Sequence, residues 1–304
     1  RVPSKLVDDP GLLIDRIIWR NKRGLMGGVI ELLKEMDDDN PYASEVWKIR
    51  AGQVRDAIDV GDYSGALSLL NNAGNKLESS DRADALWLTG WLQFDFLKNP
   101  EEAYKAFYQM YKTVTYPVSK SRAAFWAARA AQANGNADIA ASWYGVASQF
   151  QSTFYGQLAM DKTHPGQPLM IAQVNPNEDL VKQYMQDDLV KIVKQLVSVG
   201  QVHLADPFIA YLNEQADTPD KLSALAEAFG EMGMHFGSVR TAKSAVKINL
   251  VLSRRGWPIT HIDDQFGLEA ALPHAIARQE SEFNIKAESA AGARGLMQLM
   301  PTTA

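Results

Sequence analysis

The sequence predicts an all-α protein, and three observations support this class. Apolar residues recur at spacings of three and four, as in Leu12, Leu13, Ile17 and Ile18. Alternation with a period of two, which is typical of half-buried strands, is nearly absent. A short motif also recurs every 37 residues, which indicates helical hairpins that each bury one face on the next.

The repeated motif contains a capping residue, a small residue four positions later and a large apolar residue after four more. Its copies are Asp62, Ala66 and Leu70; Asn99, Ala103 and Phe107; and Asn136, Ala140 and Tyr144. The Asp or Asn side chain can accept a hydrogen bond from a free amide of the first helical turn. The alanine lets two helices approach closely, and the large residue fills the core. This period is close to that of tetratricopeptide-type repeats, so we expect an α-superhelix of stacked hairpins.

Two turn-rich segments divide the chain. The first begins at Thr163 and continues to Asn177, and the second spans residues 254–258. We therefore predict a superhelical domain over residues 1–163, a helical linker domain over 164–262 that continues the superhelix, and a third part over 263–304. A last helix should open near Pro273 and run to about Phe283.

The composition is that of an ordinary globular protein, and it excludes several kinds of partner. The 304 residues correspond to about two domains. The 31 basic and 36 acidic side chains give a net charge of −5, which argues against sequence-independent nucleic-acid binding. Without cysteine there is no disulfide, no Cys-ligated zinc and no thiol nucleophile. A lack of thiols is compatible with a bacterial periplasm.

The start of the chain and its hydropathy also bear on its location. The first residue is Arg1 and no apolar leader follows it, so we expect a removed signal peptide or a start inside a longer protein. No run approaches the ~18 apolar residues that a membrane span needs.

The five histidines show no metal-ligand spacing, and no phosphate-binding loop or Gly-x-Ser-x-Gly motif is present. We therefore expect neither a metal nor a cofactor.

One segment, residues 275–304, differs from the helical repeats. On a helix, Ala277 lies one turn before Glu280 and Phe283 lies one turn after it. This spacing places a carboxyl group on an apolar face near a helix C-terminus, and both surroundings favour the protonated acid. A protonated carboxyl group near neutral pH can act as a general acid. Spacing alone leaves a salt-bridged Glu280 as the commoner interpretation, and it leaves Glu282 and Glu288 as alternatives.

A resemblance to a known family decides between these alternatives. The run Glu280-Ser-Glu-Phe-Asn284, followed by residues 289–304, resembles the catalytic motif of the soluble lytic transglycosylases, which cleave peptidoglycan with a domain similar to goose-type lysozyme. Ile285 stands where the family usually has proline. Phe154–Ala159 also resembles a segment of the long-chain branch of this family, whose N-terminal region is α-superhelical.

The resemblance implies a lyase of cell wall turnover in which Glu280 is the sole catalytic acid and base. Such an enzyme cleaves the bond between N-acetylmuramic acid and N-acetylglucosamine and leaves 1,6-anhydromuramic acid ends. The implied substrate-binding residues are Ser281, Gly292, Ala293, Gly295, Met297 and Gln298. The implied partners are peptidoglycan glycan strands and other cell-wall enzymes, and the implied location is the periplasm. No cofactor, nucleic acid or membrane span is implied.

The end of the chain keeps two other interpretations open. In the family the catalytic domain continues well past the Met-Pro-x-Thr-Ala stretch, whereas this sequence ends at Ala304. We therefore expect residues 263–304 to form only the N-terminal part of such a domain, so that the chain as given could lack activity. The first alternative function is then a non-catalytic helical scaffold that binds glycan or protein partners. The second is a tetratricopeptide adaptor whose C-terminal motif is a chance similarity.

Overall fold

The structure is a computed structural model of the chain, and it describes residues 6, 9–36, 41–71, 77, 79–261 and 267–303. Within these ranges the protein contains helices and no β-strand, only two isolated bridges at Glu288, Arg294 and Leu299. The predicted all-α class is therefore confirmed. None of the helices that the structure describes is long and apolar enough to cross a membrane. The chain divides into two compact units, residues 1–169 and 170–304.

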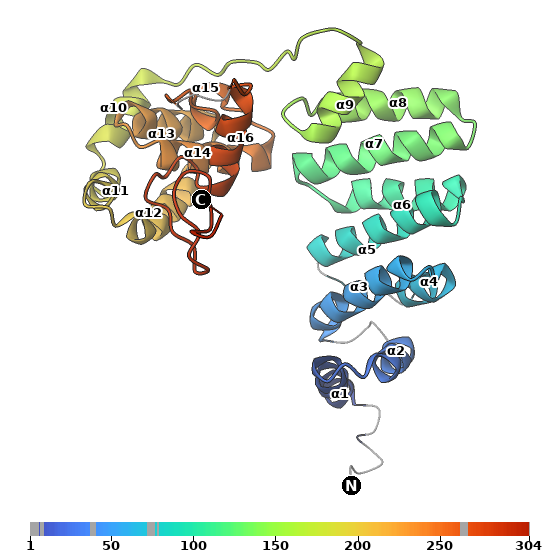
Figure 1. Cartoon of the computed structure of the whole chain (residues 1–304). Helices are drawn as coiled ribbons and strands as arrows, with labels where there is room; N and C mark the ends of the chain where they lie inside the picture. The colour runs from blue at the N-terminus through green and yellow to red at the C-terminus, as the bar shows by residue number, and fades with distance from the viewer. Residues whose placement is uncertain are drawn as a thin grey trace. The chain divides into compact units, whose positions relative to one another are not determined.

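The first unit is a stack of helices that follow one another in chain order (Figure 1). Its helices are α1 (Pro10–Lys22), α2 (Met26–Glu35), α3 (Ala43–Asp59), α4 (Tyr63–Asn71), α5 (Ser79–Trp91), the π-helix η2 (Leu92–Phe96), α6 (Pro100–Thr113), α7 (Pro117–Ala133), α8 (Ala137–Ser148) and α9 (Phe154–Thr163). From α5 to α9 each helix packs on the next along the chain. This is the arrangement of consecutive hairpins that the 37-residue repeat predicts.

The repeated motif has the roles expected of it, with one exception. Asp62 Oδ1 accepts a hydrogen bond from Gly65 N (2.9 Å), and Asn99 Oδ1 accepts one from Glu102 N (3.3 Å). Asn136 precedes α8 but its side chain makes no capping hydrogen bond, so this part of the prediction is wrong. The small and large positions of all three copies are buried: Ala66, Ala103, Ala140, Leu70, Phe107 and Tyr144.

Aromatic rings fill the space between α5, α6 and α7. The ring centroids of Trp87, Phe107 and Trp126 lie 5.5–5.9 Å from one another. Arg122 and Arg129 of α7 stack on Trp87 and Trp126, at 3.7 and 4.4 Å from the ring centroids. Such stacking adds to the burial of apolar area between helices whose small residues allow close approach.

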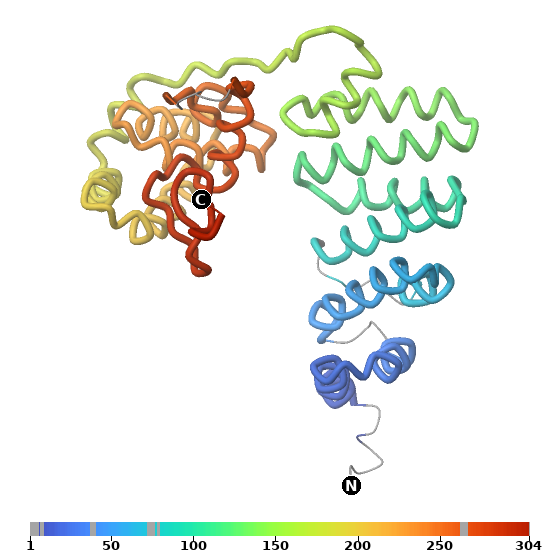
Figure 2. The backbone as a smooth tube through the Cα atoms, in the orientation of Figure 1, coloured from blue at the N-terminus to red at the C-terminus, as the bar shows by residue number. Residues whose placement is uncertain are grey.

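The second unit begins with a non-helical connection and continues as a smaller helical domain. Its helices are α10 (Glu178–Gln186), α11 (Asp188–Ser198), α12 (Val202–Gln215), α13 (Pro219–Glu231), α14 (His235–Ala245), the short 3₁₀ helix η3 (Val246–Ile248), α15 (Ser253–Gly256) and α16 (Ala271–Glu280). The core lies between α11, α12, α13 and α14, where Val193, Ile209, Leu225 and Phe229 are fully buried. After α16 the chain continues as irregular coil to residue 303 (Figure 2).

The first predicted break lies between two helices, whereas part of the second, residues 254–258, belongs to the short helix α15 (Ser253–Gly256). The last helix is shorter than expected. Helix α9 ends at Thr163 and α10 begins at Glu178, as the turn-rich composition of this segment predicts. The boundary between the two compact units falls after residue 169 of the chain. The proposed division at 163 and 262 stays a prediction, and residues 262–266 lie outside the described ranges. Helix α16 ends at Glu280 instead of Phe283, because Glu282 and Phe283 have left-handed φ angles of 53° and 65°.

Candidate active site

Glu280 is the last residue of α16, and the buried side of this helix fixes its position. Ala277, one turn earlier, is fully buried, and it packs with Val239 of α14, Phe283 and Leu296. The amides of Ser281 and Phe283 both donate to the carbonyl oxygen of Ala277, at 3.1 and 3.3 Å. The helix therefore stops at Glu280 with its apolar face held against α14.

The Glu280 side chain faces a cavity of about 610 Å³ that has two walls. The motif wall consists of residues 279–282, 284, 286–288 and Gln298. The helical wall consists of Gly200, Val202, His203 and Asp206 at the start of α12, with Phe236 and Arg240 of α14. Glu280 itself is exposed and most of the lining residues are polar. The expected apolar surroundings of Glu280 are therefore wrong: Ala277 and Phe283 turn into the protein, and the carboxyl group turns into the cavity.

Glu282, the first alternative to Glu280 as the catalytic carboxyl group, forms two ion pairs. Its oxygens accept hydrogen bonds from Arg240 Nε (3.0 Å) and Lys243 Nζ (2.8 Å), and its side chain is 14% exposed. Arg240 also pairs with Asp206, with 2.6 Å between Nη1 and Oδ1. These contacts fasten the turn after α16 to α14 and α12. Glu282 has a structural role here.

The second alternative, Glu288, pairs with Arg294 at 3.1 Å on the exposed side of the loop. Within the described part of the chain, the Glu280 carboxylate has no hydrogen-bond or ion-pair partner. Among the described carboxyl groups that line this cavity, Glu280 is thus the one without a partner. Its catalytic role stays a prediction.

A strained turn separates Glu280 from the rest of the motif. Two successive residues with side chains, Glu282 and Phe283, adopt the left-handed conformation, which costs free energy wherever a Cβ atom is present. The turn is held by Asn284, whose amide donates to Ser281 O (2.9 Å) and whose Oδ1 accepts from Lys286 N (3.0 Å). The buried Phe283 ring and the ion pairs of Glu282 offset this strain.

Ser281 is buried, and its hydroxyl contacts backbone. Its Oγ lies 2.8 Å from Leu296 O and 3.0 Å from Ala277 O. The hydroxyl thus connects the end of α16 to the glycine-containing loop. Contact of Ser281 with a substrate stays a prediction.

The other predicted binding residues lie in that loop, and the structure brings only Gln298 into the cavity lining with Glu280 and Ser281. The Gln298 amide donates to Ala287 O and Gly295 O, both at 3.0 Å. Gly295 and Gly292 have φ angles of 74° and 89°, which glycine adopts at little cost.

The last two predicted residues, Ala293 and Met297, also lie outside the cavity lining. Ala293 closes a turn with Ser289 through hydrogen bonds of 2.9 and 3.0 Å. Met297 is 37% exposed.

Sequence reasoning missed the helical wall. The segment from Gly200 to Ala205 indicates a hairpin corner, and nothing local shows that His203 and Asp206 face the motif. The only available signal is charge: Arg240 and Lys243 lie one turn apart on α14 and are suited to bind an acidic side chain from elsewhere.

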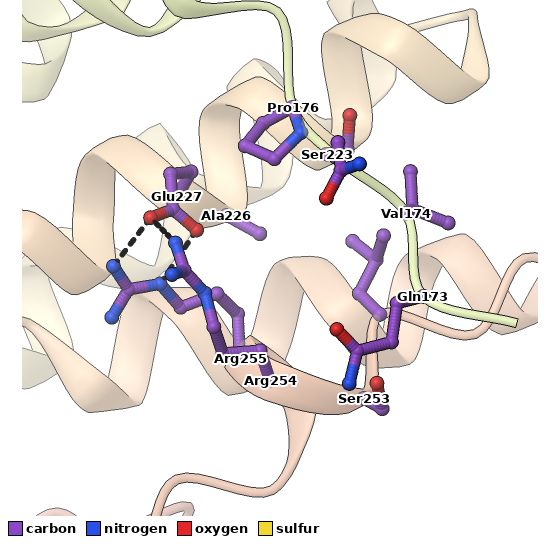
Figure 3. A pocket seen from close by; sticks show the side chains of 11 residues that line it. Gln173, Val174, Pro176, Ser223, Ala226, Glu227, Ser253, Arg254 and Arg255 are labelled. Carbon is purple, nitrogen blue, oxygen red and sulfur yellow. Dashed lines mark hydrogen bonds and ion pairs between the residues drawn. The ribbon is translucent and has the colours of Figure 1, made fainter. Parts of the chain in front are cut away.

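A second, smaller cavity of about 110 Å³ lies between the connection to α10 and the helices α13 and α15. Figure 3 shows Arg254 and Arg255 directed at Glu227 on one side, and Gln173 and Ser253 on the other. Glu227 is 4% exposed, and its carboxylate binds both arginines, with Arg255 Nε at 2.8 Å. Burial lowers the pKa of Arg255, and the charge of Glu231 opposes this shift. The cluster ties α15 to α13.

Comparison with known proteins gives one family-model match and several similar solved structures. Residues 258–304 match the family model of the transglycosylase SLT domain. Among solved structures, the chain is similar to an inactive mutant, with glutamine in place of a glutamate, of the lytic transglycosylase Slt from Pseudomonas aeruginosa. The TM-score is 0.56 at 20% identity, over 100% of this chain and 53% of that chain.

Two further structures are similar. For the 70 kDa soluble lytic transglycosylase from Escherichia coli, the TM-score is 0.52 at 19% identity, over 97% of this chain and 56% of that one. For the complex of the 70 kDa soluble lytic transglycosylase with bulgecin A, it is 0.51 at 15% identity, over 99% and 52%. The chain thus spans little more than half the length of these proteins. Residues 258–304 carry the transglycosylase SLT domain signature, and the chain has the helical fold of the soluble lytic transglycosylases, as the motif at Glu280 predicts.

Proposed function

We propose that this protein is a peptidoglycan lytic transglycosylase in which Glu280 is the catalytic acid and base. The observation that carries the proposal is the position of Glu280. It ends α16, faces a cavity of about 610 Å³ and has no partner for its carboxylate among the described residues. A single carboxyl group in such a place can give a proton to a glycosidic oxygen and take one back.

The comparisons support the same activity. The matched SLT domain model includes Glu280, and one similar structure is described as an inactive mutant with glutamine in place of glutamate. Glutamine has the shape of glutamic acid but no acidic proton, so loss of activity on that change is the behaviour expected of an essential acid.

In the first proposed step, the bond between C1 of N-acetylmuramic acid and the oxygen of N-acetylglucosamine breaks. Glu280 gives its proton to the departing oxygen. The acetamido oxygen of the same muramic acid bonds to C1, so the substrate supplies the nucleophile that a second carboxylate supplies in most glycosidases.

In the second step, the ionised Glu280 takes the proton of the 6-hydroxyl group, and O6 bonds to C1 as the acetamido oxygen leaves. The product is a 1,6-anhydromuramic acid end, Glu280 regains its proton, and no water is consumed. The proposed substrate is the peptidoglycan glycan strand, and the proposed setting is cell wall turnover in the periplasm, beside other cell-wall enzymes.

The test is digestion of purified sacculi, with mass spectrometry of the released fragments. We expect fragments that are lighter by one water than hydrolase products. Glu280→Gln should release none, while Glu214→Gln, an exposed glutamate of α12 that does not line the cavity, should match the unchanged protein. The helical signal in circular dichroism should be equal for all three proteins.

Three outcomes would contradict the proposal. Activity retained in Glu280→Gln would exclude Glu280 as the acid. Products that contain the added water would indicate a hydrolase. Binding of glycan without turnover by the unchanged protein would support the alternative of a non-catalytic scaffold.

A further inference from the structure

The Glu280 cavity has a second chemical feature on the side where its two walls meet. Lys286, on the motif wall, reaches across to Gly200 on the helical wall. A Cβ atom placed on Gly200 would lie 3.1 Å from Lys286 Nζ and 3.5 Å from its Cδ. The Lys286 side chain therefore lies over Gly200, beside the first turn of α12 that carries His203.

None of the described acidic side chains that line the cavity forms an ion pair with Lys286. Arg240 is neutralised by Asp206 and Glu282, at 2.6 and 3.0 Å. Among the residues that the structure describes, Lys286 has neither an ion pair nor a side-chain hydrogen bond. The cavity thus contains one free carboxyl group, Glu280, and one free ammonium group, Lys286, which do not pair with each other.

His203 adds a second donor on the same side. It lines the cavity from the first turn of α12, and its ring is exposed. Within the described ranges, its ring makes no hydrogen bond. An ammonium group and an imidazole that face one space are suited to bind an oxyanion, because both donate hydrogen bonds and the ammonium group carries a positive charge.

A glycan of N-acetylated sugars is itself uncharged. In peptidoglycan, muramic acid without a stem peptide carries a lactyl carboxylate. Where a stem peptide is attached, the lactyl carboxyl group is an amide and the carboxylates lie on the peptide. We propose that Lys286, assisted by His203, binds a carboxylate on the lactyl or peptide substituent of muramic acid. The protein would then select carboxylate-bearing strands over chitin-like glycans. This inference rests on the proposed function, since it assigns a substrate group to the same cavity.

The test is binding, measured by isothermal titration calorimetry on the Glu280→Gln protein so that no turnover occurs. Three probes separate the sources of the carboxylate: a tetramer of N-acetylglucosamine, peptide-free muramic-acid-containing strands, and strands that carry stem peptides. The variants are Lys286→Met, Lys286→Arg and the control Lys194→Met, an exposed lysine of α11 that does not line the cavity.

We expect Lys286→Met to weaken binding of the carboxylate-bearing strands about tenfold, the effect of losing one charge-assisted hydrogen bond. Binding of the N-acetylglucosamine tetramer should not change. Lys286→Arg should restore most of the affinity. Weaker binding only of the peptide-free strands would identify the lactyl carboxylate, and weaker binding only of the peptide-bearing strands would identify the peptide. Weaker binding of both kinds would show that Lys286 accepts a carboxylate from either source.

Other results would overturn the inference. Unchanged binding of every probe by Lys286→Met would show that the lysine is merely solvated. An equal loss with the tetramer, or with Lys194→Met, would show an effect that does not depend on a carboxylate. If the Glu280→Gln protein binds none of the three probes, both the proposed function and this inference fail. If it binds the probes equally well with and without Lys286, only this inference fails.

Discussion

The Ser281 hydroxyl lies 2.8 Å from the carbonyl oxygen of Leu296, and this contact joins the end of α16 to the loop that carries Gly295 and Gln298. Ser281 is 6% exposed, so water does not readily replace the contact. Because Glu280 is the neighbouring residue, its direction depends on a loop that lies well beyond it in the chain.

Replacing Ser281 by alanine should destabilise this part of the protein. The change removes the donor to Leu296 O and leaves that carbonyl oxygen without its partner, which costs about 1–2 kcal/mol of unfolding free energy. Urea denaturation followed by circular dichroism measures the loss. Ser198→Ala, at the exposed end of α11, is the control and should change stability by less than about 0.5 kcal/mol. Equal stability of Ser281→Ala and the parent would show that the hydroxyl does not hold the loop.

Replacing Glu282 by glutamine should also destabilise the protein. Its carboxylate binds Arg240 and Lys243 in a site where it is 14% exposed. The loss should be about 1–3 kcal/mol, between the values for exposed and buried ion pairs. Glu288→Gln breaks an exposed pair with Arg294, whose side chains are 58% and 67% exposed, and should cost less than about 1 kcal/mol.

A double-mutant cycle separates the ion pair from other effects of Glu282→Gln. Lys243→Met should destabilise the parent and should have little effect once Glu282 is glutamine, because the pair is then already broken. Additive losses in the two variants would contradict the role assigned to this pair.

The cluster around Glu227 predicts a larger effect. Glu227→Gln keeps the size of the side chain but leaves Arg254 and Arg255 without the carboxylate that binds both. Because the Glu227 side chain is 6% exposed, we expect a loss of about 3 kcal/mol. Glu231→Gln, at the exposed end of the same helix, should have a much smaller effect. A loss as small as that of the Glu231 variant would show that the cluster does not hold α15 on α13.

Much of the helical fold could be predicted because its determinants are local. A cap such as Asn99 and the buried residues Ala103 and Phe107 lie within one turn or two of one another, so their spacing in the sequence is their spacing in the helix. Asn136 shows the limit of this reasoning. The same residue type at the same position precedes α8, but its side chain makes no capping hydrogen bond.

The site was predictable only where it follows from the motif itself. Glu280 was identified from its resemblance to a family, whereas its exposure was not, because two left-handed residues end α16 early and turn Phe283 inward. The helical wall could not be predicted, since only the tertiary fold brings His203 and Arg240 to the cavity that Glu280 lines. Long-range contacts of this kind leave no periodic signal in one sequence.

Burial of tyrosine predicts a loss of stability at high pH. Burial raises the pKa of Tyr144, an effect that the charge of Arg129 opposes, and burial also raises the pKa of Tyr184. A raised folded-state pKa means that the neutral phenol contributes its full stability below the unfolded value of about 10. That stability is lost as the pH rises through the folded pKa, because the unfolded state ionises first.

Tyr144→Phe tests this dependence. The variant loses the hydrogen bond from the Tyr144 hydroxyl to Gln132 Oε1 (3.0 Å), which lowers stability by a similar amount at neutral and mildly alkaline pH. Above about pH 10 its unfolding free energy should fall less steeply than that of the parent. Urea denaturation at a series of alkaline pH values gives both slopes, and equal slopes would contradict the prediction.

The close contact between Gly90 of α5 and the ring of Phe107 of α6 predicts the effect of one substitution and of a second one that rescues it. A Cβ atom on Gly90 would lie 2.4 Å from Phe107 Cε1, and Phe107 is fully buried, so the ring cannot move into solvent. Gly90→Ala should therefore cost about 1–3 kcal/mol by overpacking. Gly145→Ala in α8, where no atom lies within 4 Å of the added Cβ, should instead stabilise the protein by about 0.5–1 kcal/mol, since alanine is the better helix former.

The rescue distinguishes overpacking from a general effect on α5. Phe107→Leu alone removes part of a buried ring and destabilises the protein, but in the Gly90→Ala background it makes room for the new methyl group. The double variant should thus be more stable than the sum of the two single losses predicts, by about 0.5–3 kcal/mol. Denaturation of the four proteins measures this coupling. Strict additivity would show that Gly90 and Phe107 are not in the contact that sets the spacing of α5 and α6.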